Sequence, residues 1–485
     1  MFVGLDIGTS SAKAVAIGAD GEVLRHASVA HKAVARKAGI SEQDPDEWLR
    51  SAAAALSRLG VARPSALAIT GQMHGLVLLD GAGRVLRSAI LWNDTRAVAE
   101  RAELEALNDV RWLVGHTGNR ALTGFTAPSL LWVQRNEPHV WRQICYVLLP
   151  KDYVRLQLCG GLRRAEALTD VSDASGTLLF DVARRRWSPA VLEALDLNPT
   201  WLPAVVESSE RAGTTLAGTL VAAGAGDQAA AALGLGLTPD GPLGVALGTS
   251  GVVTRVTRDP QLLDADGRLQ MMCAARGGVW QTIGVTLSAA GSLAWWAPIC
   301  GVPQSGVAAL MDEAMAAPAG CDGLTFLPYL SGERAPHMDA SARGAFVGLS
   351  AHHDRAAMTR AVIEGVAFSL ADVLDLFGAD SAEAVARVTG GAARNDFVLT
   401  VLAAVLGLRL ERPVVDEGPA YGAALLAAVA ADALEERDLA DSFFAVDAVV
   451  EPAPALRAFY DDARVGFRRL YPALAQRGSV ASEIA

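Results

Sequence analysis

The chain has 485 residues, 51% of them hydrophobic, which allows two or more domains with sizeable cores. Its 42 basic and 53 acidic residues give a net charge of −11 without a lysine or arginine cluster, so we expect no nucleic-acid partner. The five cysteines form no C-x-x-C pair and no apolar run reaches the ~18 residues of a membrane span, so we expect a soluble cytoplasmic protein without a membrane partner.

The first strand is expected at the start of the chain and ends at a sharp turn, Asp6-Ile7-Gly8-Thr9-Ser10-Ser11, before a second strand. Glycine lets the backbone approach an anion closely, and the hydroxyls and amides that follow can donate hydrogen bonds to phosphate oxygens. A shorter copy returns 240 residues later, from Ala246 to Gly251, with Ala246 in the place of Asp6. We therefore expect two halves of similar fold, of which only the first carries a carboxylate at its turn.

Turn and capping signals predict the next elements. Gly18-Ala19-Asp20-Gly21 predicts a hairpin, so the chain should open as an antiparallel meander. Asp44 followed by Pro45 predicts the start of a helix that runs to about Leu59.

Two more strands are expected at 66–69 and 89–92, and each ends in a polar segment, 70–75 and 93–96. Polar groups just beyond strand ends are the usual ligand site of open sheets. The residues from about 100 to 220 are expected to be mostly helical.

The first half ends with a strand, a glycine turn and a helix start at Gly224-Ala225-Gly226-Asp227-Gln228-Ala229. This segment matches the G-x-G-x-x-A of dinucleotide-binding folds. The motif closes a half instead of opening one, and 241–256 lacks the Asp or Glu that would bind a ribose, which argues against a dehydrogenase. No G-x-x-x-x-G-K-[ST] occurs, so the sequence excludes a P-loop NTPase.

Asp227 is a lone acid in an apolar segment, and its position allows two interpretations. It could cap the helix, which is worth about 0.5–2 kcal/mol, or act as a general base at the mouth of a cleft. Three glycine and hydroxyl turns, at 8–11, 248–251 and 390–395, offer more phosphate-binding groups than folding needs and favour a bound nucleotide. Asp6 would then hold Mg²⁺ through water, and the two carboxylates would support phosphoryl transfer to a hydroxyl.

The second half continues with elements that alternate between helix and strand. A long helix is expected at about 354–376, and a strand at 387–389 leads into the turn 390–395. Two helices rich in alanine and leucine follow, at 396–406 and 419–432.

Eight short motifs, in one order along nearly the whole chain, resemble those of the FGGY carbohydrate kinases, members of the sugar kinase, Hsp70 and actin superfamily. The motifs are Gly4-Leu5-Asp6-Ile7-Gly8-Thr9-Ser10, Gly71-Gln72-Met73-His74-Gly75, Trp92-Asn93-Asp94, Gly226-Asp227-Gln228, Gly248-Thr249-Ser250, Gly332-Glu333-Arg334-Ala335-Pro336, Gly344-Ala345-Phe346-Val347-Gly348-Leu349 and Thr389-Gly390-Gly391-Ala392-Ala393-Arg394-Asn395. The resemblance implies an α/β fold with two actin-like, ribonuclease H-like domains that each contain a mixed sheet and flank a catalytic cleft. The N-terminal domain, 1–240, would bind the sugar, and the C-terminal domain, 241–485, would bind the nucleotide.

The resemblance also implies roles for single residues in an ATP-dependent kinase that uses Mg²⁺. Asp227 would be the general base that takes the proton from the terminal hydroxyl of the sugar, and Asp6 would support Mg²⁺ and the transferring phosphoryl group. The nucleotide would contact Thr9, Ser10, Ser11 and Lys13 in the first domain and Gly248, Thr249, Ser250, Gly390, Gly391 and Asn395 in the second. The sugar would contact Met73, His74, Trp92, Asn93, Asp227 and Gln228.

Within the family, the pair Met73-His74 points to D-xylulose, which the enzyme would convert to D-xylulose 5-phosphate. Gln228 does not fix the sugar, because related kinases vary between Asn and Gln there, so another ketopentose or a polyol, such as ribulose or arabinitol, stays an alternative. A further alternative is an actin-like or Hsp70-like ATPase without a sugar acceptor, against which Met73-His74 and Asp227 argue. Family members are often dimers, so the resemblance also implies a homodimer.

Overall fold

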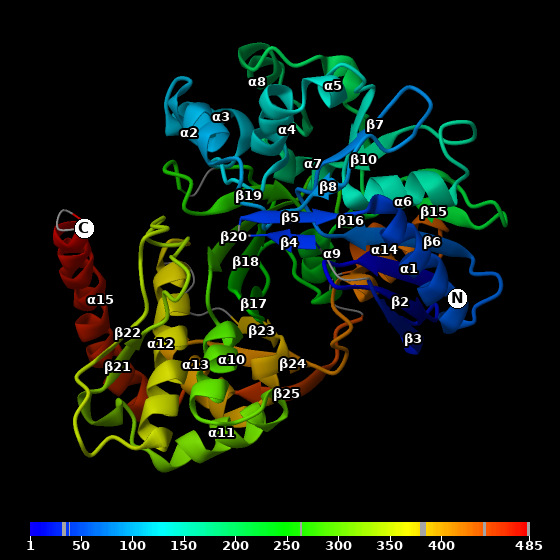
Figure 1. The fold of residues 1–485 in the computed structure, drawn as a ribbon. Helices are drawn as coiled ribbons and strands as arrows, with labels where there is room; N and C mark the ends of the chain where they lie inside the picture. Colours follow the sequence, from blue (N-terminus) through cyan, green and yellow to red (C-terminus); the bar gives the residue numbers. More distant parts are fainter. Residues whose placement is uncertain (32–34, 38, 262–263, 379–384, 440–442, 483–485) are drawn as a thin grey trace. The chain divides into compact units, whose positions relative to one another are not determined.

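The computed structural model describes residues 1–31, 35–37, 39–261, 264–378, 385–439 and 443–482. The chain folds into two compact units, each with a mixed sheet and helices packed against it (Figure 1), which confirms the predicted fold class. Unit 1 comprises Met1–Asp240, Val256–Thr282 and Glu417–Phe444, and unit 2 comprises Gly241–Arg255, Ile283–Asp416 and Ala445–Ala485. Two segments of the predicted domain 241–485 therefore pack within unit 1.

The sheet of unit 1 carries the predicted opening meander. Its strands follow the order β14-β15-β6-β1-β2-β3, and β16 also pairs with β6. The bounds are β1 Phe2–Ile7, β2 Ser11–Ile17, β3 Val23–Ala30, β6 Ala66–Gly71, β14 Arg211–Thr214, β15 Leu220–Ala222 and β16 Ala225–Gly226. β1 is antiparallel to β2 and parallel to β6, which is in turn parallel to β15 and β16. Gly21 has φ of 77° in the turn between β2 and β3, a left-handed conformation that glycine adopts without strain.

Helix α1 (Pro45–Leu59) covers one face of this sheet. Its first turn is capped by Asp44, whose carboxylate accepts a hydrogen bond from the amide of Asp46, as the sequence predicts. Trp48 is fully buried and lies in one core cluster with Leu5 of β1. The apolar side of this helix therefore fixes the side chains that alternate along β1.

Helix α14 (Pro419–Ala430) covers the opposite face of β1, although it comes from late in the chain. The contact is so close that a Cβ at Gly4 would lie 1.9 Å from the carbonyl oxygen of Ala420. Successive residues of a strand point to opposite faces, so Asp6 lies on the same face as Gly4. α9 (Asp227–Gly234) packs against α14 through the same kind of contact, at Gly422.

The part of unit 1 between α1 and β14 is helical over a shorter stretch than predicted. Helices predominate only up to residue 158, and they are α2 Val98–Ala106, α3 Val110–Thr117, α4 Thr126–Asn136, α5 Pro138–Trp141 and α6 Pro150–Leu158. The chain then forms short elements, namely β10 Leu168–Asp170, α7 Val171–Ala174, β11 Phe180–Asp181, β12 Arg186–Trp187, α8 Pro189–Ala194 and β13 Ala204–Val206. The prediction of helix up to about residue 220 is therefore wrong, because strands of two or three residues leave no periodic pattern in a sequence. Small sheets add β4 Ala35–Lys37, β5 Ile40–Gln43, β7 Val77–Leu79, β8 Ala89–Ile90 and β9 Tyr146–Leu148. β19 (Gln270–Cys273) is the first strand in the order of the second seven-stranded sheet.

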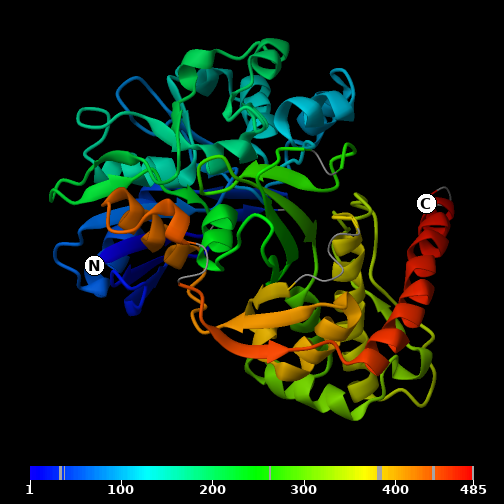
Figure 2. The same ribbon diagram turned by 180° about the vertical axis from the view of Figure 1, so that it is seen from behind.

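Unit 2 contains the second copy of the strand, turn and strand. β17 (Leu243–Leu247) is antiparallel to β18 (Gly251–Thr257) and parallel to β23 (Val385–Thr389). β24 (Arg409–Pro413) and β25 (Val446–Val450) follow β23 toward one edge and lie side by side as the orange strands of Figure 2. β18 adjoins β20, which spans Trp280–Thr286.

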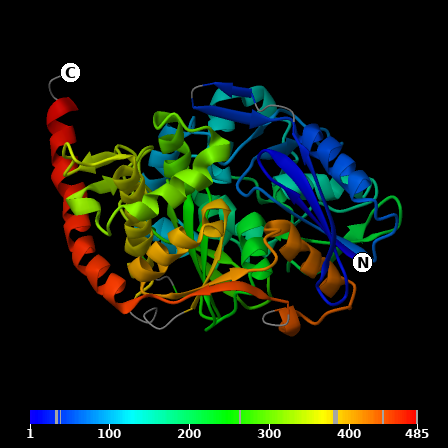
Figure 3. The same ribbon diagram turned by 90° about the horizontal axis from the view of Figure 1, so that it is seen from below.

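Long helices pack against the sheet of unit 2. The helices predicted at 354–376 and 396–406 are α12 (Arg355–Asp375) and α13 (Asp396–Leu406), and α12 is buried along almost its whole length. α15 (Pro454–Ser482), the red helix of Figure 3, packs against both. Unit 2 also contains α10 Ala290–Ile299, α11 Val307–Glu313, β21 Thr325–Leu327 and β22 Ala345–Val347. Among the described residues, no helix is long and apolar enough to cross a bilayer.

Candidate active site

The two predicted catalytic aspartates lie at one edge of the sheet of unit 1. Asp6 near the end of β1 is opposite Thr70 of β6, and Thr70 is opposite Ala225 of β16. Neighbouring strands are about 4.8 Å apart, so β1 and β16 are separated by about 10 Å. Asp227 directly follows β16 as the first residue of α9. The carboxyl ends of these parallel strands, where open sheets bind ligands, therefore bring both acids to one place.

Burial changes the acidity of both aspartates. Burial, together with the negative charge of Asp227, raises the pKa of Asp6 to about 8 against the positive charge of Lys13. Burial also raises the pKa of Asp227, to about 6, against hydrogen bonds from the amide and side chain of Gln228. A carboxylate with a pKa close to neutral is suited to accept a proton during a reaction.

Asp227 does not cap α9. The capping position belongs to Gly226, which makes no side-chain capping hydrogen bond, and Asp227 is the first residue inside the helix. Its carboxylate still accepts a hydrogen bond from the first-turn amide of Gln228, so a local role at the start of the helix and the role of a general base both stay predictions.

A ring of polar side chains holds the turn after β1. The hydroxyl of Thr9 donates to Oε1 of Gln72 (3.1 Å) and accepts a hydrogen bond from the indole of Trp92 (3.0 Å). Gln72 donates to Oε1 of Gln43 (3.4 Å), which also accepts from the indole of Trp48 (2.6 Å). The ring closes where Nε2 of Gln43 reaches the carbonyl of Thr9 (3.5 Å). Gln43 was not predicted, because only its burial beside the helix cap marks it and burial is invisible in a sequence.

His31 holds the same turn from the other side. Its Nε2 lies 2.9 Å from the carbonyl oxygen of Gly8, its Nδ1 lies 2.8 Å from the hydroxyl of Ser51, and its amide donates to the carbonyl of Ser10 (2.9 Å). Burial lowers the pKa of His31, so the ring is neutral at neutral pH, with Nε2–H as the donor to Gly8. No motif marks this residue, which lies 23 positions from Gly8.

The predicted phosphate-binding side chains of this turn differ in their contacts. Ser10 is exposed, and Ser11, the first residue of β2, is partly exposed. The ammonium of Lys13 pairs with Glu417 of unit 1, at 2.7 Å from its carboxylate and 3.0 Å from its carbonyl oxygen. A contact between Lys13 and a phosphate stays a prediction, and it would have to compete with this ion pair.

Several contacts hold His74 in one position. Its φ of 71° is unusual for a residue with a side chain, and its Nδ1 donates to the carbonyl of Gly176 (2.7 Å). The ring stacks on Phe125 with centroids 4.1 Å apart, and the carbonyl of His74 accepts a hydrogen bond from Thr126 (3.0 Å). A strained backbone that several contacts fix is common at functional sites.

The other predicted sugar contacts fall into buried and exposed groups. Met73 is buried and so close to Gly226 that a Cβ there would lie 2.9 Å from its Sδ. Gln228 is exposed, and Trp92 is 44% exposed with its indole N–H directed to Thr9. Oδ1 of Asn93 is buried without a hydrogen-bond partner, so it could accept a hydrogen bond from a bound hydroxyl.

The predicted nucleotide turns of unit 2 also meet at the carboxyl ends of parallel strands. Ala246 of β17 is opposite Thr389 of β23, so the turns 248–250 and 390–391 lie next to each other. Gly390 has φ of 102°, and a Cβ there would lie 2.5 Å from the carbonyl oxygen of Leu247. Only glycine allows this approach of the two turns.

The start of α10 supports the turn 248–250 through the backbone. The amides of Ala289 and Gly291 donate to the carbonyl of Thr249 (2.8 and 3.1 Å), and the amide of Ala290 donates to that of Gly248 (2.9 Å). The hydroxyl of Ser250 lies 3.5 Å from the carbonyl oxygen of Leu287, in the segment before α10.

Glu333, from the motif Gly332 to Pro336, anchors that same segment. Its carboxylate accepts hydrogen bonds from the hydroxyl of Thr286 (3.0 Å) and the amide of Leu287 (2.8 Å). Burial raises the pKa of Glu333 to about 7 against these hydrogen bonds. The motif was recognised from the sequence, but its contact with the residues before α10 was not predicted.

Asn395, the last predicted nucleotide contact, has a clear local role. It caps α13, since its Oδ1 accepts from the amide of Val398 (3.1 Å), and its Nδ2 donates to Asp312 (2.7 Å). Its contact with a nucleotide stays a prediction.

Asp6 fits the part of a magnesium ligand. Within the described ranges, no three His, Cys, Asp or Glu side chains converge as a metal site would require. Mg²⁺ is usually held by only one or two carboxylates and completes its shell with phosphate oxygens and water. Oδ1 of Asp6 is buried and has no hydrogen-bond partner, so it is an oxygen that a cation could satisfy.

Comparisons with known proteins agree along almost the full length of the chain. Models of the N-terminal and C-terminal domains of the FGGY family of carbohydrate kinases match residues 1–234 and 243–431. The xylulose kinase of Escherichia coli K12 is 40% identical over 492 residues, which cover 98% of this chain and 99% of that protein. The crystal structure of a xyloylose kinase from Brucella ovis superimposes with a TM-score of 0.90 at 38% identity and covers 98% of this chain and 99% of its own. The structure of a gluconate kinase from Lactobacillus acidophilus gives the same TM-score at 25% identity, with 98% of each chain covered.

Proposed function

The chain belongs to the FGGY family of carbohydrate kinases and is therefore a phosphotransferase, and we propose that it transfers the γ-phosphoryl group of ATP to D-xylulose to form D-xylulose 5-phosphate. The observation that carries this proposal is the pair of acids at one sheet edge, of which Asp227 has a pKa of about 6. The choice of D-xylulose is supported by the E. coli xylulose kinase, which is 40% identical over nearly the full length of both chains.

In this proposal Asp227 is the general base. Its carboxylate takes the proton from the terminal hydroxyl of the sugar as the oxygen attacks the γ-phosphorus, a contribution of typically ~10²–10⁴ in rate. The bond between the γ-phosphorus and the bridging oxygen breaks, and ADP leaves with that oxygen. His74 and Asn93 would orient the sugar, since one is fixed by stacking and hydrogen bonding and the other has an unsatisfied acceptor.

Asp6 would hold Mg²⁺ at the turn of unit 1. The ion would neutralise negative charge on the β- and γ-phosphates when bound. The exposed hydroxyl of Ser10 and the amides of this turn would donate to phosphate oxygens, and Gly248, Thr249 and Gly390 of unit 2 would bind the nucleotide. This division puts the sugar and its base on unit 1 and most nucleotide contacts on unit 2.

Competing sugars provide the test. The gluconate kinase shares the fold at a TM-score of 0.90, so the fold alone does not select the acceptor. ADP release would be measured with ATP and D-xylulose, ribulose, arabinitol or gluconate, and without sugar. We expect the highest kcat/KM with D-xylulose and a much slower release without sugar. An equal or higher kcat/KM with another sugar would overturn the substrate, and equal release without sugar would overturn the kinase reaction.

A further inference from the structure

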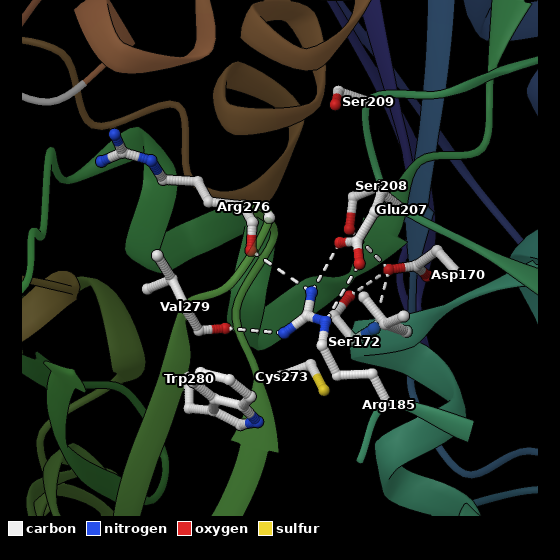
Figure 4. A network of polar contacts seen from close by, with 12 residues as sticks. Asp170, Ser172, Arg185, Glu207, Ser208, Ser209, Cys273, Arg276, Val279 and Trp280 are labelled. Atoms are coloured by element: carbon white, nitrogen blue, oxygen red, sulfur yellow. Dashed lines mark hydrogen bonds and ion pairs between the residues drawn. The ribbon is translucent and has the colours of Figure 1, made fainter. Parts of the chain in front are cut away.

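We propose that Asp170 is a positioning residue for Asp227, because its carboxylate holds both ends of the segment Gly224-Ala225-Gly226 through two serines. The inference rests on the proposed role of Asp227 as the base. Figure 4 shows Asp170 with its two serine partners, Ser172 and Ser208.

Ser172 holds the end of the segment that adjoins Asp227. Its hydroxyl oxygen accepts a hydrogen bond from the amide of Gly226 (3.0 Å), and its hydroxyl hydrogen points to Oδ2 of Asp170 (2.5 Å). The single hydroxyl proton is used on the carboxylate, so the oxygen lone pair is directed to the amide. Gly226, the residue before Asp227, is therefore fixed by the side chain of Ser172 in α7.

Ser208 holds the other end of the segment. Its carbonyl oxygen accepts a hydrogen bond from the amide of Gly224 (3.0 Å), and its hydroxyl donates to the same Oδ2 of Asp170 (2.7 Å). One carboxylate oxygen thus sets the distance between the two groups that bind Gly224 and Gly226. The Glu207 carboxylate beside Ser208 pairs with Arg185 (2.9 Å), and Arg185 also donates to the carbonyl of Val279 (3.0 Å), as Figure 4 shows.

Asp170 is itself anchored in the interior. It is fully buried, its Oδ2 accepts from the amide of Ser172 (2.9 Å), and its Oδ1 lies 3.0 Å from the ammonium of Lys151. Lys151 is also fully buried, and the carboxylates of Asp152, Asp170 and Asp173 raise its pKa against the effect of burial. Hydrogen bonds to charged groups are shorter and stronger than neutral ones, so this anchor resists displacement.

The two glycines of the segment give it conformational freedom that the pairing of β16 with β6 limits only at Ala225 and Gly226. Gly224 has φ of 80°, and glycine adopts many conformations at little cost. Gly226 occupies the capping position of α9 without a capping side chain. A displacement of about 1 Å at a reacting group can lower a rate by about 10²-fold, so the contacts of Ser172 and Ser208 bear directly on catalysis.

Two buried serines three residues apart make a matched test. Ser172→Ala removes the contact with Gly226, whereas Ser175→Ala removes an equivalent contact, since the hydroxyl of Ser175 accepts from the amide of Cys273 (3.0 Å) and donates to the carbonyl of Val171 (2.7 Å). We expect Ser172→Ala to lower kcat about tenfold or more, with KM for D-xylulose within about twofold of the wild type. We expect Ser175→Ala to keep kcat within about twofold. Equal losses of kcat in the two variants would overturn the proposal.

A double-mutant cycle separates positioning from a general loss of structure. In an Asp227→Asn background, Ser172→Ala should lower the residual rate by less than about twofold, because Ser172 acts only through Asp227. A loss as large as in the wild-type background would contradict the proposal. Should Ser172→Ala fail to fold, Ser208→Ala takes its place in both measurements; it removes the hydroxyl bond to Asp170 but keeps the carbonyl contact with Gly224, so we expect a smaller loss of kcat, about threefold, that again disappears in the Asp227→Asn background. Failure of the proposed function is seen separately, as wild-type protein without sugar-dependent ADP release or as an Asp227→Asn variant that keeps its activity.

Discussion

The two copies of the strand, turn and strand are held in place by different means. In unit 1, side chains from distant parts of the chain fix the turn, including Gln72, Gln43 and His31. In unit 2, the backbone amides at the start of α10 support the turn 248–250, and Glu333 holds the residues before α10. A similar backbone can thus be supported either by a polar side-chain network or by the start of a helix.

The difference follows the presence of a carboxyl group in only one of the two copies. The turn of unit 1 contains Asp6, whose pKa is raised to about 8, while Ala246 occupies the matching position in unit 2. A buried carboxylate that must keep one position needs fixed polar neighbours, because a small shift changes its interactions strongly. The turn of unit 2 carries no carboxyl group and offers only amides and hydroxyls, so it does not need fixed polar side chains around it.

The largest effect is expected from removing Asp227, the proposed general base on unit 1. Asp227→Asn should lower kcat by about 10²–10⁴-fold, because the amide cannot accept the proton of the sugar hydroxyl. Steady-state ADP release with D-xylulose would measure it, and circular dichroism would show that the variant is folded. If the variant keeps a tenth or more of the wild-type kcat, Asp227 is not the general base.

A smaller effect is expected from opening the side-chain network of the first turn. Gln72→Ala removes the acceptor of the Thr9 hydroxyl and one of the two donors to Oε1 of Gln43, and a lost hydrogen bond of this kind costs about 0.5–1.5 kcal/mol. We expect kcat/KM for D-xylulose to fall about tenfold. Gln157→Ala, in α6 and outside the network, is the control, and a similar loss in both variants would refute the special role of the network.

The backbone support of unit 2 can be tested at a pair of adjacent glycines. Gly390→Ala forces an alanine to φ of 102° and places a Cβ 2.5 Å from the carbonyl oxygen of Leu247, which should cost about 1–3 kcal/mol in the free energy of unfolding. Gly391→Ala meets nothing within 4 Å and should change it by less than about 0.5 kcal/mol. Urea unfolding of both variants gives the comparison, and equal stability would show that the second turn tolerates a side chain.

The last prediction concerns the pH dependence of stability. The folded-state pKa of Asp227, about 6, lies above its ordinary value of 3.8, so the protonated group favours the fold and this contribution is lost as pH rises through about 6. Asp227→Asn should therefore have a higher melting temperature than the wild type at pH 8, with the difference shrinking toward pH 4. A melting temperature of Asp227→Asn that is lower than that of the wild type at pH 8 would contradict the assigned burial of Asp227.

The same proton should appear in the activity of the wild type. We expect kcat/KM to fall below about pH 6 as Asp227 takes up its proton.

The sequence predicts local features well and distant contacts poorly. Gly8, Asp44 and Gly390 mark their turns and caps because local backbone demands select their residue types. Gln43 and His31 approach the first turn only through tertiary packing, and a buried glutamine looks like any other glutamine in a sequence. The network of Asp170 was also missed, since its short strands and helices were expected to be part of one helical region.

The packing of α14 on β1 orders events during synthesis. The ribosome releases β1 first, yet the helix that covers Gly4 and the face of Asp6 is encoded after residues 283–416 of unit 2. The nascent chain must therefore keep this face uncovered until about nine-tenths of the polypeptide has been made. A fragment that ends at residue 240 would leave the ribosome with an apolar surface open to chaperones or to aggregation.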